Sequence, residues 1–238
     1  MLVLHYTGME SGPAAEARLC DPASEVSAHY LVREDGVIVQ MVAEAQRAWH
    51  AGVARWQGEG DLNSRSIGIE IVNGGHDFPD ANGRLTPFPE VQISAVISLS
   101  RAVLARWPID QTRIVGHSDI APSRKRDPGE HFPWRRLSQE GVGLWPPEAP
   151  TRDGPPEGGA ALRAGDTGVE VERMQAMLLA IGYDLSVTAA FDEAAQAAVR
   201  AFQRRWRPER VTGEADAACL DMIARVRAIY ASAADGAA

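Results

Sequence analysis

Two histidines directly follow short apolar segments, at positions where strand ends often carry functional side chains. His5 ends the segment LVLH, and His117 follows the segment RIVG. Asp127 lies downstream in a loop that Pro122 and Pro128 would hold rigid. A catalytic zinc takes about three nitrogen or oxygen ligands and keeps one position open, so these three side chains could hold one. Hydrogen-bonded histidines beside a solvated RKRD turn are the alternative that spacing alone leaves open.

An acidic and a basic side chain accompany this candidate site. Glu70 is the lone acid of the apolar strand SIGIEIV, whose alternation places the isoleucines on one face and Glu70 on the other. Burying such an acid is costly unless it is paired or used in chemistry, so it is either a proton-transfer group or the partner of an arginine. Lys125 stands two residues before Asp127 in the same loop.

A tryptophan and a histidine in the segment RAWHAG are candidates for the wall of a substrate groove. Trp49 and His50 lie on a predicted loop with a glycine close by. The same side chains could instead pack the loop, and the sequence does not separate these readings. Asn63 is a further candidate for the groove.

The remaining histidines and both cysteines are expected to be structural or incidental. His29 precedes a predicted strand and is expected to be a hydrogen-bonded structural residue. His76 and His131 lie in polar segments, where exposure is expected. Cys20 and Cys219 are too few for a disulfide framework and are not spaced like a thiolate metal site.

The elements that must position these residues can be read from hydrophobic periodicity. Residues 66–72 alternate, and a Glu-Asp-Gly sequence at 34–36 between two short apolar runs predicts an antiparallel hairpin. Apolar residues at helical spacing predict a helix over 89–107, ended by Pro108. Strands mixed with a long helix indicate an α/β fold with a mixed central sheet flanked by helices. The strands are expected at 2–4, 30–33, 37–42, 66–72 and 113–116.

The chain divides at a segment rich in proline and glycine. Residues 145–160 hold five prolines and three glycines without apolar periodicity, which is typical of a linker. We expect a first domain over 1–144 and a second over 161–238, each with its own hydrophobic core. Three apolar stripes after the linker predict a small domain of three helices.

Charge and composition exclude several classes of function. The 238 residues carry a net charge of -8, which argues against a mainly electrostatic attachment to nucleic acid or anionic lipid. No apolar run reaches the roughly 20 residues that a membrane span requires, and the first residues lack the pattern of a signal peptide. As written, the sequence predicts a cytoplasmic protein, whereas a start further upstream would allow the periplasm or cell envelope.

Five motifs in order resemble the zinc-dependent N-acetylmuramoyl-L-alanine amidases of the type-2 amidase family. The family is related to anhydro-muropeptide amidases and peptidoglycan recognition proteins. The resemblance implies a mixed sheet with flanking helices, a zinc ion bound by His5, His117 and Asp127, and catalytic roles for Glu70 and Lys125. It extends over about residues 2–137. The motifs are LVLHYTG, VSAHYLVREDGVIVQMV, RAWHAGV, NSRSIGIEIVN and GHSDIAPSRKRDPGEHFPW.

A second resemblance follows the linker. The segment beginning LRAGDTGVEVERMQAMLLAIGYDL is similar to the three-helix peptidoglycan-binding module often attached to wall hydrolases. That module usually has glycine before its Phe-Asp pair, where this chain has Ala190. The resemblance therefore implies the fold of the module more strongly than its binding.

Together these features predict an amidase that cleaves between the lactyl group of N-acetylmuramic acid and the L-alanine of the stem peptide. Peptidoglycan or its muropeptide fragments would be the substrate, and zinc the cofactor. A recognition protein that binds muropeptides without cutting them is the alternative, and a zinc peptidase acting within the stem peptide is a third. One structural difficulty is that His5 lies at a terminus that would tend to fray unless a neighbouring segment holds it.

Overall fold

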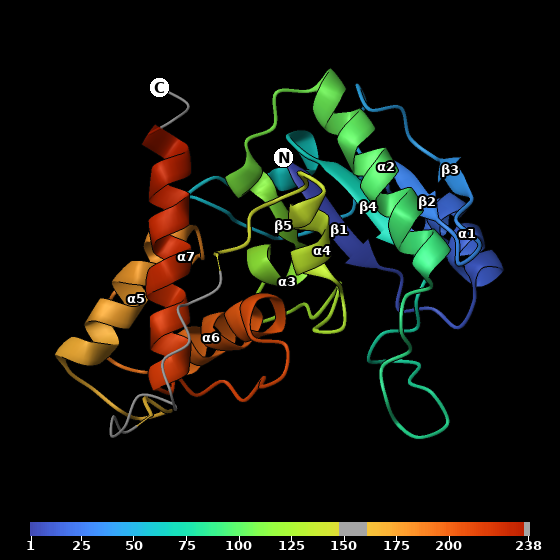
Figure 1. Ribbon diagram of the computed structural model, residues 1–238. Helices are drawn as coiled ribbons and strands as arrows, with labels where there is room; N and C mark the ends of the chain where they lie inside the picture. The colour runs from blue at the N-terminus through green and yellow to red at the C-terminus, as the bar shows by residue number, and fades with distance from the viewer. Residues whose placement is uncertain (148–160, 236–238) are drawn as a thin grey trace.

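A mixed five-stranded sheet lies at the centre of the computed structural model, which describes residues 1–147 and 161–235 (Figure 1). The strand order is β3-β2-β4-β1-β5. β2 and β3 form the predicted antiparallel hairpin, and the other neighbouring strands are parallel. The mixed sheet is thus confirmed. The strands are β1 (Leu2–Tyr6), β2 (Tyr30–Val32), β3 (Ile38–Gln40), β4 (Ile67–Ile71) and β5 (Ile114–Gly116).

Helices from both parts of the sequence surround the sheet. The predicted long helix is α2, which covers one face. The three helices predicted after the linker are α5, α6 and α7. The described residues form seven α-helices: α1 (Gly12–Cys20), α2 (Glu90–Arg106), α3 (His117–Ile120), α4 (Trp134–Gln139), α5 (Val169–Ile181), α6 (Glu193–Trp206) and α7 (Ala217–Asp235). None of the helices in these ranges is both long enough and apolar enough to span a bilayer.

The strand that carries His5 is held on both sides. β1 lies between β4 and β5, and the Met1 ammonium group donates a hydrogen bond to the Arg65 carbonyl at 2.9 Å. All five β1 residues are buried. A neighbouring segment therefore does hold this strand, and the expected fraying is prevented by pairing.

The two faces of the sheet belong to two different hydrophobic clusters because side chains alternate along each strand. Leu2, Leu4 and Ile69 face α2, where they pack with Ile93 and Val96. The opposite face carries the candidate site residues at the carboxyl ends of its strands. The sheet therefore separates the packing under α2 from the candidate site.

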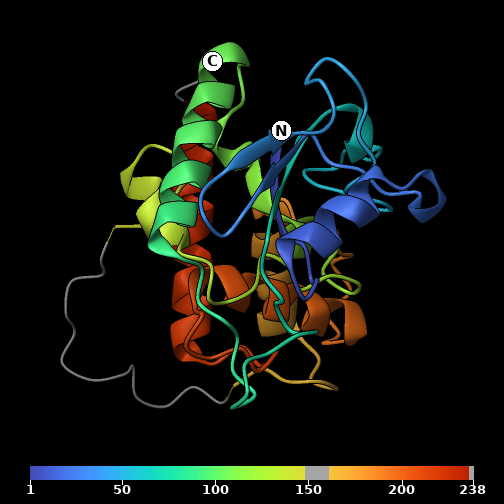
Figure 2. The same ribbon diagram turned by 90° about the vertical axis from the view of Figure 1, so that its right-hand side faces the viewer.

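The second face shares one cluster with the three C-terminal helices. Val3 and Val115 of the sheet belong to the same buried cluster as Met174, Phe202 and Ile223 of α5, α6 and α7. In Figure 2, α5 and α6 lie below the sheet, and α7 runs upward behind α2. The expectation of two separate cores is wrong because the first part of the chain lacks a long helix for this face. Helical stripes in the sequence show what is buried but not its partner.

Specific contacts fix this packing. The Trp56 ring lies 5.2 Å from that of Tyr183, and a Cβ on Gly182 would approach the Trp56 ring to 2.8 Å, so only glycine fits there. The buried pair of Asp119 on α3 and Arg205 on α6 adds an ion pair at 2.9 Å. The aromatic contacts and the ion pair together join the first part of the chain to the helices.

Most of the expected linker, residues 148–160, lies outside the described residues. Trp145 at its start is partly buried, with its ring centroid 5.4 Å from that of Trp206.

The position where the binding module usually has glycine is occupied by Ala190. Among the described residues after the linker, the non-glycine residue with a positive φ is its neighbour Ala189 (φ 59°). The Ala190 carbonyl accepts a hydrogen bond from the side chain of Gln175.

Candidate metal centre and active site

Parallel strands bring the predicted site residues together at one edge of the sheet. β1 and β4 pair so that His5 is the direct register partner of Glu70. β5 lies on the other side of β1, and His117 follows its last residue as the first residue of α3. Functional groups gather outside the carboxyl ends of parallel strands in open α/β sheets, and these three do so here.

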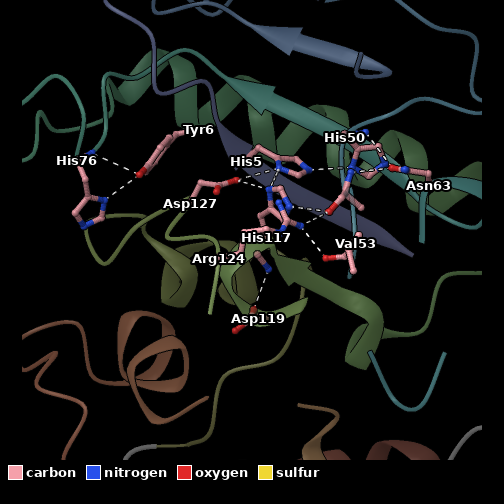
Figure 3. Close-up of polar contacts among 12 residues, drawn as sticks. His5, Tyr6, His50, Val53, Asn63, His76, His117, Asp119, Arg124 and Asp127 are labelled. Atoms are coloured by element: carbon pink, nitrogen blue, oxygen red, sulfur yellow. Dashed lines mark hydrogen bonds and ion pairs between the residues drawn. The ribbon is translucent and has the colours of Figure 1, made fainter. Parts of the chain in front are cut away.

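Three ligand atoms form a buried triangle (Figure 3). His5 Nδ1 lies 2.9 Å from His117 Nδ1 and 3.0 Å from Asp127 Oδ2. His117 Nδ1 lies 3.0 Å from the same carboxylate oxygen. His5, His117 and Asp127 are 1%, 3% and 5% exposed, so all three are largely shielded from solvent. The structure thus brings together the three residues predicted as metal ligands.

The loop that carries Asp127 folds back onto α3. The Ser118 amide donates to the Asp127 carbonyl at 2.8 Å, and the Lys125 amide donates to the Ala121 carbonyl at 2.9 Å. These backbone bonds place Asp127 beside His117 even though the loop has little regular structure. They also present Lys125, the only lysine of the chain, to the cavity.

The electrostatic environment suits ligands that bind a cation. Burial, with a smaller contribution from His117, lowers the pKa of His5 to about 4. Burial alone would raise the pKa of Asp127, but the charges and hydrogen bonds of His117 and His5 lower it below its usual value. Near neutral pH the site therefore presents a neutral imidazole of His5 and a carboxylate.

A cavity of about 430 Å³ opens beside the triangle. Glu70 and Lys125 both line it. Glu70 Oε2 is buried without a hydrogen-bond partner among the described residues. Burial and the negative charge of Asp127 raise the pKa of Glu70 well above its ordinary value, while Lys125 opposes this. As predicted, Glu70 points away from the isoleucine face, and it has a free oxygen with which to handle a proton.

The residues considered for the substrate groove occupy three different positions. Trp49 is 54% exposed and lines the cavity. His50 also lines the cavity but is 7% exposed and contacts His5. Asn63 lies behind the cavity wall, where its side-chain oxygen accepts hydrogen bonds from the amides of His50 and Ala51.

The expectations for the other histidines are only partly met. His29 is 1% exposed and satisfied on both ring nitrogens, by the Gly68 amide and the Gln46 carbonyl, which confirms a structural role. The expected exposure of His76 and His131 is wrong. His76 binds the Tyr6 hydroxyl and is partly buried, and His131 stacks on a phenylalanine ring. A polar sequence context did not reveal these tertiary contacts.

Several residues near the site were not found by sequence reasoning. His117 Nε2 lies 3.0 Å from the Ala51 carbonyl, to which Arg124 also donates at 2.8 Å. Ser66 contacts the ring of His50 at 3.2 Å. A backbone carbonyl carries no sequence signal, and an isolated serine carries little, so only the fold reveals them.

The triangle fits a metal ion by both chemistry and spacing. Its two imidazole nitrogens and one carboxylate oxygen are ligands that zinc prefers. The described residues yield one such cluster of His, Cys, Asp or Glu side chains, and its members are His5, His117 and Asp127. Separations of 2.9–3.0 Å can be bridged by one ion with bonds of about 2.0–2.2 Å. The cavity leaves a side of the triangle accessible to substrate.

Comparison with known families and structures agrees with this geometry. Residues 167–223 match a family described as a peptidoglycan binding domain. The amidase AmiD of Escherichia coli is 38% identical over 224 residues, which cover 91% of this chain and 78% of AmiD. The AmpD amidase of Enterobacter cloacae is 42% identical over 112 residues, covering 47% of this chain and 55% of AmpD. The match to AmpD thus spans about half of each protein.

Solved structures match the whole arrangement. E. coli AmiD, in a complex with the substrate anhydro-N-acetylmuramic acid-L-Ala-D-γ-Glu-L-Lys, has a TM-score of 0.80 at 34% identity, covering 97% of this chain and 89% of AmiD. AMPDH3 of Pseudomonas aeruginosa has a TM-score of 0.80 at 32% identity, covering 97% and 92%. Residues 1–130 match the family described as N-acetylmuramoyl-L-alanine amidase. The chain therefore belongs to the N-acetylmuramoyl-L-alanine amidase family.

Proposed function

We propose that this protein is a zinc-dependent amidase that acts on muropeptides. It hydrolyses the amide between the lactyl group of N-acetylmuramic or anhydro-muramic acid and the L-alanine of the stem peptide. The observation that supports this most directly is the buried triangle beside a cavity that also contains Glu70 and Lys125. Membership of the N-acetylmuramoyl-L-alanine amidase family supports amide hydrolysis as the reaction.

His5, His117 and Asp127 are the residues that would hold zinc. Their ligand atoms converge on one point, and their burial fixes their orientation. When bound, zinc would supply Lewis acidity, which polarises the amide carbonyl and lowers the pKa of water so that it can lose a proton and attack near neutral pH.

Glu70 is proposed to move the proton. Its free carboxylate oxygen accepts a proton from the attacking water and then delivers that proton to the leaving amine nitrogen as the amide bond breaks. A raised pKa suits this double role because the group must both take up and release a proton near working pH. Lys125 faces the same cavity, where its ammonium group stabilises the oxyanion of the tetrahedral intermediate.

The groove around this site is proposed to take the muramyl and stem-peptide parts of the substrate. Trp49 offers an exposed aromatic face at the cavity, which suits contact with a sugar ring or an acyl group. The complexes of AmiD and AMPDH3 contain an anhydro-muramyl tripeptide and an anhydromuramic pentapeptide. Those ligands support soluble anhydro-muropeptides as substrates here.

The division of labour along the chain is also a proposal. We assign catalysis to residues 1–144, a connection to 145–160 and peptidoglycan binding to 161–238. The match of residues 167–223 to a peptidoglycan binding family supports the last assignment.

Mass spectrometry of the products tests the proposed function. A purified anhydro-muramyl tripeptide incubated with the zinc-loaded full chain should yield free anhydro-muramic acid and a tripeptide with a free L-alanine amine. Cleavage within the stem would identify a peptidase instead. Binding without any product would identify a recognition protein.

A further inference from the structure

A chain of hydrogen-bonded, buried polar groups extends from His5, the candidate ligand on β1. His5 Nε2 is 2.9 Å from His50 Nδ1, and His50 Nε2 is 3.2 Å from Ser66 Oγ. Ser66 Oγ in turn contacts the Leu62 carbonyl at 2.5 Å. The three side chains are at most 9% exposed, so solvent does not compete for these hydrogen bonds.

The direction of each hydrogen bond follows from the last acceptor. A carbonyl only accepts, so the single hydroxyl proton of Ser66 goes to Leu62. The serine oxygen must then accept a hydrogen bond from Nε2–H of His50, which leaves Nδ1 of that neutral ring without a proton. His50 Nδ1 therefore accepts from Nε2–H of His5. As a result, Nδ1 of His5 presents its lone pair to the triangle.

A second carbonyl does the same for the other ligand histidine. His117 Nε2 lies 3.0 Å from the Ala51 carbonyl and must donate to it, so its Nδ1 is bare as well. The Asn63 side-chain oxygen holds both His50 and Ala51 by their amides, at 3.0 and 2.8 Å. One dipeptide thus contacts both ligand histidines and is itself fixed by one asparagine.

The strand beneath His50 leaves room for its ring. A Cβ on Gly68 would lie 2.4 Å from Cγ of His50, so any larger residue in the centre of β4 would displace the imidazole. This close approach ties the position of His50 to the same strand that carries Glu70.

When both rings are neutral, these bonds leave acceptors facing one another with no proton between them, and a hydrogen bond to Asp127 forms only when a ring carries a proton on both nitrogens. The bare Nδ1 atoms of His5 and His117 and the Asp127 carboxylate stand 2.9–3.0 Å apart. Such an arrangement is repulsive in a buried site unless a cation occupies it. The surrounding network therefore prepares the triangle for a cation.

We propose that Ser66, His50 and the Ala51 carbonyl, fixed by Asn63, form an outer shell that locks both ligand histidines in the tautomer with Nδ1 free for metal. This inference rests on the proposed zinc site. His50 is a positioning residue in it, acting through His5. Without the network, each neutral ligand ring could carry its proton on Nδ1 instead of Nε2. Nδ1 would then have no free lone pair for the metal.

Zinc affinity, measured by competition with a chromophoric chelator on the full chain, tests the proposal with four variants. His50→Leu removes the acceptor and should weaken zinc binding about 10- to 100-fold. His50→Asn keeps an acceptor near the position of Nδ1 and should recover most of the loss. Ser66→Ala removes only the group that orients His50 and should weaken binding by an intermediate amount. His131→Leu removes a partly buried histidine outside the network and serves as the control.

Histidine ¹⁵N NMR of the metal-free protein gives a readout that a merely structural role would not move. The proposal requires the Nε2–H tautomer for His5 and His117 in the wild type, and mixed tautomers for His5 in His50→Leu. An Nδ1–H tautomer of His5 in the wild type, or wild-type zinc affinity in both His50→Leu and Ser66→Ala, would overturn it. If His50→Leu does not fold, Ser66→Ala decides. A wild type that binds no zinc would refute the proposed function, while the tautomers still decide this inference.

Discussion

At the scale of single residues, Glu70 and Asp127 carry the same functional group beside one cavity, yet their surroundings shift their pKa values in opposite directions. Burial raises the pKa of Glu70, with the charge of Asp127 adding to it. Two histidines overcome the same burial at Asp127 and lower its pKa. One carboxyl is therefore suited to move a proton and the other to bind a cation.

The role of Glu70 predicts a specific kinetic effect. Glu70→Gln keeps the size and polarity of the side chain but cannot take up a proton. The rate on a soluble anhydro-muropeptide should fall about 10²- to 10⁴-fold while zinc content and thermal unfolding stay unchanged. Glu130→Gln is a matched control because Glu130 is also partly buried but pairs with His76 outside the cavity lining. Near-normal turnover of Glu70→Gln would show that this residue is structural.

The sequence predicts the candidate metal ligands but not the residues that hold them in place. His5 and His117 could be predicted because they follow apolar strands, and the loop acid Asp127 because prolines flank its segment. The contacts of His50 with His5 and Ser66 join residues 45 and 16 positions apart, and no local pattern encodes them. Such contacts depend on how loops cross the sheet edge.

At the scale of elements, strands were predictable wherever alternation was strong. The register of β1 against β4, which sets His5 beside Glu70, requires the fold itself. α1 carries only two buried residues, Gly12 and Ala15, so its apolar pattern gives no clear signal. One partly buried acid also joins elements in a way that its sequence does not show. Glu44 accepts hydrogen bonds from Tyr30 of β2, from Arg106 of α2 and from Trp107.

This junction predicts a pH-dependent contribution to stability. The hydrogen bond from Arg106 is the main reason that the pKa of Glu44 falls from 4.5 to about 2. Because the folded-state pKa is depressed, the stabilisation is present above about pH 4.5 and is lost as the pH falls toward 2. Glu44→Gln should lower the free energy of unfolding by about 1 kcal/mol near neutral pH, given that Arg106 is half exposed.

Urea unfolding of wild type and Glu44→Gln between pH 2 and 7 measures this difference. The gap between the two proteins should close as the pH approaches 2. A gap that is constant across the range would mean that the charge of Glu44 contributes nothing.

At the scale of the whole molecule, the C-terminal helices form a layer of the fold. They are also the part of the chain to which we assign peptidoglycan binding. α6 reaches the active-site side through Arg205, whose guanidinium lies 4.2 and 4.5 Å from the rings of Trp134 and Trp206. It pairs with Asp119, two residues after His117, and Tyr183 donates to the same carboxylate at 2.8 Å. The sheet edge that carries the candidate metal site is thus supported from the second part of the chain.

A chain ended after Pro147 should therefore fail to fold as a stable unit. It would expose Trp56, Val115 and Ile120, which are at most 1% exposed in the complete chain, and leave Asp119 without Arg205. We expect loss of cooperative thermal unfolding, binding of a hydrophobic dye and loss of zinc. A truncated chain with the unfolding midpoint and zinc content of the full protein would contradict this, and would show that the first part of the chain folds without the helices.

The zinc content of purified full-length Asp127→Ala tests most directly whether the buried triangle holds the catalytic zinc. We expect stoichiometric zinc in the wild type, and loss of both zinc and turnover in this variant, because a carboxylate corner of the triangle is removed. Asp77→Ala is the matched control, since Asp77 lines the same cavity but pairs with Arg126 at 2.9 Å. It should keep its zinc. Stoichiometric zinc and normal turnover in Asp127→Ala would show that His5, His117 and Asp127 do not form the catalytic zinc site.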